Sequence, residues 1–187
     1  LPYSIRLLDP TAQLLTTASS FQVRTTDRLQ GTLGVPLVVA NGVEYTQVDA
    51  TTWPNLVSIA NGGRLNLNAN LTHTFNGGLV NDGYVVIRSS DYVETHLRGT
   101  GITNRGLMEW QHTLWNNPRR IFVPIRNEAG GVLQINDGFP GGNEDVVVID
   151  AGGALHVAGG TFYLGTNAVV ALTDKTAPPE ALAFSNE

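Results

Sequence analysis

The chain of 187 residues contains no cysteine, and this absence excludes several kinds of chemistry. There can be no disulfide, no thiolate nucleophile and no cysteine-ligated zinc. The redox compartment stays open, because a chain without cysteine tolerates either condition. No apolar run approaches the roughly 18 residues of a membrane-spanning helix, so the sequence predicts no membrane segment.

Charged side chains are also scarce, at 14% of residues against about 25% in ordinary globular domains. Lysine occurs once, at Lys175, and the net charge of −5 argues against general nucleic-acid binding. Asn, Thr, Gly and Ser supply the polar surface instead. Such a neutral surface suits a stable assembly in an extracellular setting, and it is equally typical of any β-rich protein.

Motifs that would carry catalysis are missing. There is no G-x-S-x-G, no G-x-x-x-x-G-K-[ST] and no G-x-G-x-x-G that opens a helix. The histidines occur singly and without the spacing of a metal site. We therefore expect no cofactor, no bound metal and no enzymatic activity. The four histidines are His73, His96, His112 and His156.

Two weaker signals leave other chemistry open. The acidic segment 137–145 could gather a calcium ion, because hard cations take carboxylate and carbonyl oxygens, but a solvated hairpin loop is the main interpretation. Trp53, Trp110 and Trp115 could stack on sugars, whereas buried core positions are the commoner fate of tryptophan. Trp53 precedes Pro54 in a turn-like stretch and is the one expected to be exposed.

Three of the six Gly-Gly pairs repeat one pattern, in which the pair opens directly into an alternating strand, and they are the clearest positive feature. They are Gly62-Gly63, Gly130-Gly131 and Gly152-Gly153. Glycine alone takes a positive φ without strain, so such pairs predict hairpins or strand corners. We expect each pair to lie in a turn, with at least one of its glycines at positive φ.

Short runs rich in Val, Ile, Thr and Tyr, bounded by Gly, Asn, Asp and Pro, predict many strands and an all-β domain. Helix should account for less than about a tenth of the residues, far below the usual third. The segment Asn104–Asn117 is the exception, because its apolar residues have helical spacing. The same segment also fits a strand through Met108, Trp110, His112 and Leu114. Of these alternatives we expect a short helix or an irregular loop, and Pro118 ends the segment in either case.

Two architectures fit these strands. A shift of 90 residues aligns Ile59–Leu67 with Ile149–Val157, which suggests a sandwich of two related halves, and a β-sandwich or jelly roll is the main prediction. The Gly-Gly spacings are also close to multiples of 22, which would suit the rungs of a parallel β-helix or solenoid. Either way, residues 1–172 form one β domain and residues 173–187 an extended C-terminal arm.

In overall composition, with few lysines, no cysteine and a neutral polar surface, the chain resembles small viral structural proteins. These are single jelly-roll capsid subunits and capsid decoration or cement proteins of phages. The resemblance is one of style and involves no family motif, so no functional residues can be transferred. It implies a homo-oligomer, commonly a trimer, in contact with other structural subunits of a virion.

The sequence therefore predicts a non-enzymatic structural subunit, in a virion or another extracellular assembly, that acts through subunit contacts. The contacts would involve the apolar, proline-bounded ends and a basic patch. The alternative is a carbohydrate- or receptor-binding module of a tail spike or adhesin, with a glycan as partner. The expected interface residues are Tyr3, Ile5, Leu7, Arg119, Arg120, Arg126, Leu182 and Phe184.

Overall fold

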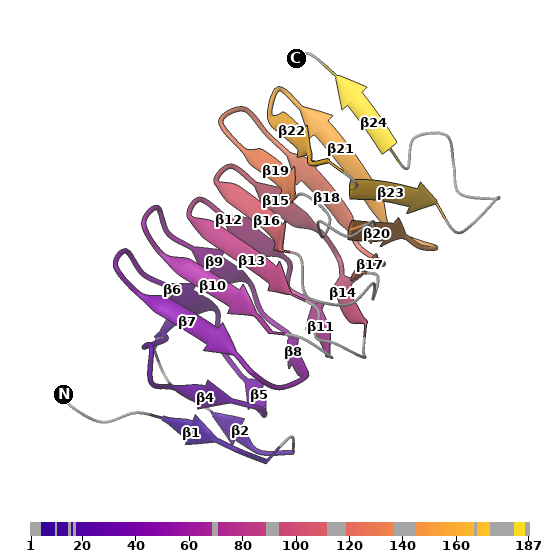
Figure 1. Ribbon diagram of the computed structural model, residues 1–187. Coiled ribbons are helices and arrows are strands. Elements are labelled where there is room, and N and C mark those ends of the chain that lie inside the picture. Colours follow the sequence, from indigo (N-terminus) through magenta and orange to yellow (C-terminus); the bar gives the residue numbers. More distant parts are fainter. Residues whose placement is uncertain are drawn as a thin grey trace.

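The structure is a computed structural model. It describes residues 5–9, 11–14, 16, 18–68, 71–88, 94–111, 119–136, 145–166, 168–172 and 182–185. Over these ranges the chain forms strands and connections and no helix, so the all-β prediction is confirmed. Figure 1 shows the strands stacked along one long axis, with the two ends of the chain at opposite ends of the stack.

Three long sheets run along this axis. Sheet I contains β3 (Phe21–Gln22), β6 (Leu37–Val39), β9 (Val57–Ile59), β12 (Leu79–Asn81), β15 (Ile102–Asn104), β18 (Pro124–Asn127), β21 (Ala154–Ala158) and β24 (Leu182–Ser185). Sheet II contains β7 (Glu44–Gln47), β10 (Arg64–Leu67), β13 (Tyr84–Arg88), β16 (Leu107–Gln111), β19 (Val132–Ile135) and β22 (Thr161–Leu164). Sheet III contains β8 (Thr51–Trp53), β11 (Thr72–Phe75), β14 (Thr95–Gly99), β17 (Arg119–Ile121), β20 (Asp145–Ile149) and β23 (Ala168–Leu172).

The chain visits sheets I, II and III in turn and then returns to sheet I one level further along. Each strand therefore pairs in parallel with the strand three positions away, as β10 does with β7 and β13. We call one such circuit a rung, and there are about six. Stacked residues are about one rung apart in sequence, for example 23 residues for Asn81 and Asn104.

This architecture is a parallel β-solenoid, which the Gly-Gly spacings offered as the alternative. The sandwich or jelly-roll prediction is wrong. Those folds need antiparallel neighbours joined by hairpins or Greek-key connections, whereas every strand pair in the described residues is parallel. Short alternating strands with glycine-rich corners are common to both architectures. The local sequence pattern therefore could not distinguish a sandwich from a solenoid.

Alternation along each strand places every second side chain in the interior, where like residues stack between rungs. On sheet I one interior column is aliphatic over six consecutive rungs. Its members are Leu37, Val57, Leu79, Ile102, Ile125 and Leu155, all buried. On sheet III the indole of Trp53 stacks on Phe75 with ring centroids 4.7 Å apart. The core is therefore a set of columns parallel to the solenoid axis.

A ladder of buried asparagines lines the corner from sheet I to sheet II. Asn81 Nδ2 donates to Asn104 Oδ1 at 2.6 Å, and Asn104 Nδ2 donates to Asn127 Oδ1 at 2.7 Å. Each amide also donates to a carbonyl of the following rung, at Leu107 and Val132 respectively. Buried amides are tolerated only when hydrogen-bonded, and here each rung supplies the partner that its neighbour needs.

The same column is apolar on either side of the ladder. Val39 and Ile59 precede Asn81, and Val157 follows Asn127. A single asparagine among apolar neighbours would leave its amide unsatisfied, at a cost of about 1–3 kcal/mol. Consecutive asparagines remove that cost, which explains why the polar positions occur together.

All three Gly-Gly pairs lie in turns, as predicted. Gly62, Gly130 and Gly152 have φ of 78°, 84° and 84°. They are corners between sheets rather than hairpins, because the strands on either side belong to different sheets. The stacking of rungs explains why the second member of each pair is glycine. A Cβ at Gly131 would lie 2.5 Å from the carbonyl oxygen of Asn104 in the preceding rung.

The three corners differ in position. Gly62 and Gly130 occupy the corner from sheet I to sheet II, three rungs apart. Gly152 occupies the corner from sheet III to sheet I. The 90-residue shift therefore aligns two unlike corners, and the spacing of 22 between the second and third pairs does not measure a rung.

The expected helix or irregular loop at Asn104–Asn117 is also wrong as far as the structure describes it. Asn104 ends β15, and residues 107–111 form β16 between β13 and β19. Met108 and Trp110 point inward and are buried, so period-2 alternation prevails over the helical spacing. Residues 112–118 lie outside the described ranges.

Two short strand pairs cover the N-terminal end of the solenoid: β1 (Arg6–Leu7) with β4 (Arg28–Leu29), and β2 (Gln13–Leu14) with β5 (Thr32–Leu33). At the other end, β24 extends sheet I beside β21. It lies within residues 173–187, the segment expected to form an arm. The described fold thus continues past residue 172.

Substitution of the corner glycines by alanine should lower stability to different degrees. Gly131→Ala should cost about 3 kcal/mol or more, because its Cβ would meet backbone of the preceding rung. Gly130→Ala should cost about 1–2 kcal/mol, from the positive φ alone. Gly101→Ala should be nearly neutral, because nothing lies within 4 Å of its Cβ position. Urea denaturation of the three variants measures the order, and equal losses would contradict it.

Candidate functional site

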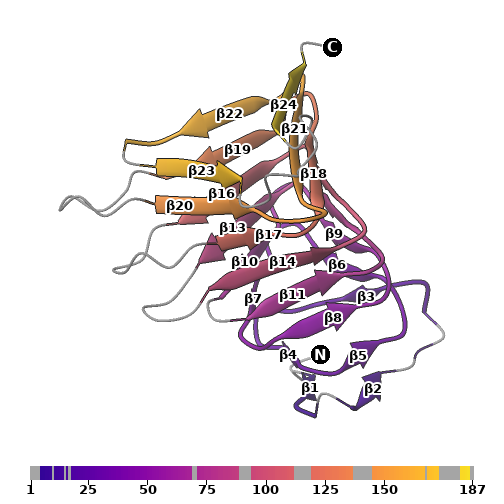
Figure 2. The same cartoon turned by 90° about the vertical axis from the view of Figure 1, so that its right-hand side faces the viewer.

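The outer face of sheet III carries a concentration of charged and aromatic side chains. Figure 2 shows its strands β8, β11, β14, β17, β20 and β23 stacked one above another. In sequence, residues 89–94, 112–118 and 136–144 separate three strands of sheet II from the strands of sheet III that follow them. Outward side chains of successive strands lie about 4.8 Å apart along the axis, so the face suits an extended ligand.

Arg120 is the centre of this face. Its Nε donates to Glu94 Oε2 at 2.5 Å, and a terminal nitrogen donates to Asp150 Oδ2 at 3.0 Å. His96 Nε2 lies 3.1 Å from the same Glu94 oxygen. Four side chains from three consecutive rungs thus form one network.

Next to the network, the Arg98 guanidinium lies over the ring of Phe122, 3.8 Å from its centroid. This is close cation–π geometry. His96 meets the same ring edge-on, with centroids 5.4 Å apart. Arg98 makes no ion pair with any residue of the described ranges, so its charge is available to a ligand.

Threonines continue the face toward the N-terminus. Thr72 is in register with His96, and Thr74 with Arg98. With Thr52 and Thr32 they border a hollow of about 320 Å³. Hydroxyl donors and acceptors therefore adjoin the charged network along one line of the solenoid. We call Thr72, Thr74, Glu94, His96, Arg98, Arg120, Phe122 and Asp150 the sheet III face.

The electrostatics of this face favour binding over acid–base chemistry. The hydrogen bond from Arg120 lowers the pKa of Glu94 below its usual value, so this carboxylate is ionised at neutral pH. Two-carboxylate glycoside hydrolysis needs one acid that keeps its proton. Glu94 does not meet that requirement, and Asp150 is bonded to the same guanidinium.

The structure separates the three arginines that were expected to form one patch. Adjacent residues of a strand point to opposite faces, so Arg119 is buried while Arg120 faces outward. Burial lowers the pKa of Arg119 to about 10. Arg126 is on sheet I, where its Nε lies 3.5 Å from Glu128 Oε1. Only Arg120 belongs to the sheet III face.

The terminal residues predicted as contacts lie at opposite ends. Ile5 and Leu7 pack against the core from the N-terminal cap. Leu182 and Phe184 lie in β24, in register with Leu155 and Val157. Tyr3 lies outside the described residues. A role for these residues in subunit contacts stays a prediction.

The tryptophans do not form a sugar-binding platform where the structure describes them. Trp53 and Trp110 are buried, so the expected exposure of Trp53 is wrong. Trp115 lies outside the described ranges, as do residues 137–144 of the acidic segment. Among described residues there is no cluster of three potential metal ligands, and no helix that could cross a membrane.

Sequence reasoning missed most of the sheet III face. Glu94 and Arg120 are 26 residues apart, and Arg120 and Asp150 are 30 apart. Because the connections vary in length, no fixed spacing links these residues. Only the register of the strands, read from the solenoid itself, would have brought them together.

Comparison with protein-family models, with curated proteins and with solved structures gives no match for this chain.

Behind this face, the interior of sheet III contains a buried histidine. His73 Nε2 lies 3.2 Å from the carbonyl oxygen of Asn68, and the ring stacks beside Trp53 with centroids 6.1 Å apart. Burial lowers the pKa of His73 to about 4. The imidazole is therefore neutral at pH 7 and packs in the core beside Trp53.

The lowered pKa of His73 predicts that the folded protein loses stability in acid. Between pH 6.5 and about 4 the unfolded chain binds a proton at His73 that the folded chain does not. The free energy of unfolding should therefore fall as the pH falls, by about 3 kcal/mol over this window. His73→Leu, which copies Leu97 in the same column, should flatten this slope.

Chemical denaturation at several pH values measures the effect. The matched control is His156→Gln on sheet I, which should keep the wild-type slope. If His73→Leu and wild type lose stability in parallel, His73 is not the cause.

Proposed function

We propose that this chain is a non-enzymatic, carbohydrate-binding β-solenoid module of an extracellular or virion fibre, of the tail-spike or adhesin type. Its ligand is an acidic oligosaccharide that lies along the sheet III face. The single observation that carries the proposal is the continuous line from the threonine hollow to Arg98 and Arg120. Hydroxyl, cationic and aromatic groups meet there in consecutive rungs.

Each group suits such a ligand. Threonine hydroxyls can exchange hydrogen bonds with sugar hydroxyls. The guanidinium of Arg98 is held over Phe122 and can bind a carboxylate through two parallel hydrogen bonds. The pairing of Arg120 with two carboxylates fixes the centre of the face and holds both carboxylates in place. These features support recognition rather than cleavage.

The test is calorimetric titration with matched neutral and acidic oligosaccharides. Acidic ones should bind more tightly, and Arg98→Ala should weaken binding at least about tenfold, the loss of 1.4 kcal/mol. Arg105→Ala is the control, since Arg105 is exposed on another corner and pairs with Asp82 at 2.7 Å. It should bind as the wild type does.

Two results would contradict the proposal. Release of shorter products by the wild-type protein would make the chain an enzyme. Absence of binding, together with a stable trimer in light scattering, would favour the second candidate, a structural subunit. One observation favours that candidate: β22 has a neighbour on one side only among the described strands, and its Tyr163 and Leu164 are 49% and 47% exposed.

A further inference from the structure

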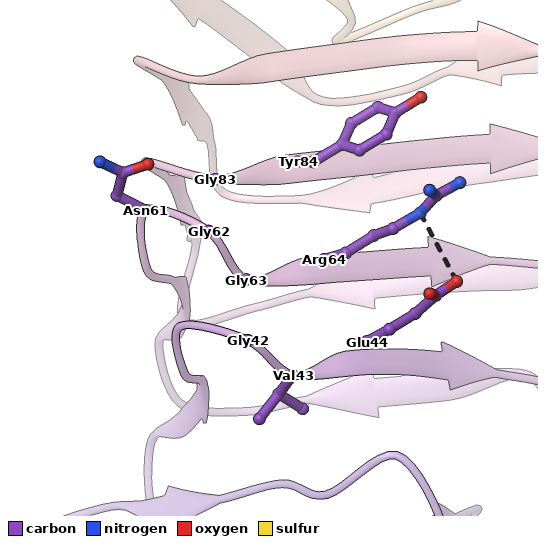
Figure 3. Close-up of a pocket in the computed structure, with 9 residues that line it drawn as sticks. All are labelled: Gly42, Val43, Glu44, Asn61, Gly62, Gly63, Arg64, Gly83 and Tyr84. Atoms are coloured by element: carbon purple, nitrogen blue, oxygen red, sulfur yellow. Dashed lines mark ion pairs between the residues drawn. The ribbon is translucent and has the colours of Figure 1, made fainter.

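A second hollow lies away from the sheet III face, at the corner between sheets I and II. Figure 3 shows it across three consecutive rungs. Its volume is about 440 Å³, within the range of about 300–1,000 Å³ typical of small-molecule sites. The lining residues are Gly42, Val43, Glu44, Asn61, Gly62, Gly63, Arg64, Gly83 and Tyr84.

Glycine makes this hollow. Gly42 and Gly62 turn the corner with φ of 74° and 78°, a region that other residues rarely adopt. Gly63 and Gly83 have backbone of the preceding rung within 2.6 Å and 2.3 Å of their Cβ positions. No side chain can therefore fill this part of the corner, and a small ligand can approach the backbone directly.

Polar groups stand along one edge of the hollow and are held in place. Arg64 Nε donates to Asn66 Oδ1 at 2.9 Å, and its guanidinium carbon lies 4.5 Å from the centroid of Tyr84. Asn66 Nδ2 in turn donates to Glu44 Oε1 at 2.8 Å. The terminal nitrogens of Arg64 and Oε2 of Glu44 make no hydrogen bond within the described structure.

The charges of this edge nearly cancel. Arg64 Nε and Glu44 Oε1 are 3.6 Å apart, the ion pair drawn in Figure 3. An anion would gain the attraction of Arg64 and lose much of it to repulsion by Glu44. A ligand that both accepts and donates hydrogen bonds without net charge satisfies the two side chains together. Adjacent hydroxyl groups of a sugar ring have this property.

We propose that this hollow binds one neutral hexose unit. One ring hydroxyl accepts a hydrogen bond from Arg64, and its neighbour donates one to Glu44. Val43 and the ring of Tyr84 supply apolar surface for the C–H groups of the sugar. The site is separate from the sheet III face, so this inference does not depend on the function proposed for that face.

Two-dimensional NMR titration of the intact chain tests the inference, with D-glucose, D-galactose, D-mannose and D-glucuronate as probes. At least one neutral hexose should shift the amide signals of Gly62, Gly63 and Tyr84 saturably, with a millimolar dissociation constant. Glu44→Gln and Arg64→Gln should each weaken that binding at least about tenfold. The side chains of Glu44 and Arg64 are partly exposed, so a thermal melt should confirm that each variant folds.

Two control variants separate this site from its surroundings. Arg105→Gln, on the same corner but outside the hollow, should change the dissociation constant less than about twofold. Arg98→Ala should leave these shifts unchanged, so that failure of one site does not count against the other. The inference is overturned if no neutral hexose shifts these signals up to about 100 mM, if glucuronate binds most tightly, or if Glu44→Gln and Arg64→Gln bind as the wild type does.

Discussion

Parallel, in-register stacking of the backbone is the constraint on which this structure depends. Each rung must present its amide and carbonyl groups to the next at a spacing of about 4.8 Å. Corners must therefore follow the same path in successive rungs, or the strands beyond them lose register. This requirement explains why glycine occurs where the backbone of the preceding rung leaves no room for a Cβ, as at Gly131 and Gly153.

Stacking also decides which side chains the interior accepts. A residue at one level is in contact with the equivalent residues above and below, so like tends to follow like in each column. The aliphatic column of sheet I and the ladder of Asn81, Asn104 and Asn127 are two outcomes of this rule. Outside, the same rule places His96 beside Arg120 in neighbouring strands. It thereby makes faces that an extended ligand can follow.

Local structure was largely predictable from the sequence. The ranges Tyr84–Arg88, Val132–Ile135 and Ala154–Ala158 are strands, as expected for short runs rich in branched and aromatic residues. The positive φ of Gly62 and Gly130 follows from glycine chemistry alone. Alternation reports only which face of a strand is buried, however, and a sandwich and a solenoid share that property.

The architecture and the site were harder to predict, because both depend on register between rungs. The corner at Asn104-Arg105-Gly106 has no Gly-Gly pair and is shorter than the corner that contains Gly130 and Gly131. The repeat was therefore hidden between residues 84 and 127. The link between Glu94, Arg120 and Asp150 was hidden for the same reason, because connections of unequal length separate them.

The absence of cysteine allows a direct test of this register. Val80 and Thr103 are in-register neighbours on the outer face of sheet I, and Arg126 lies one rung further. A disulfide needs Cα atoms about 4.4–6.8 Å apart, which neighbouring strands provide and strands two rungs apart do not. The variant with cysteines at 80 and 103 should form an intramolecular disulfide under mild oxidation, measured by mass spectrometry. The variant with cysteines at 80 and 126 should not. Failure of the first pair, or equal formation of both, would contradict the solenoid.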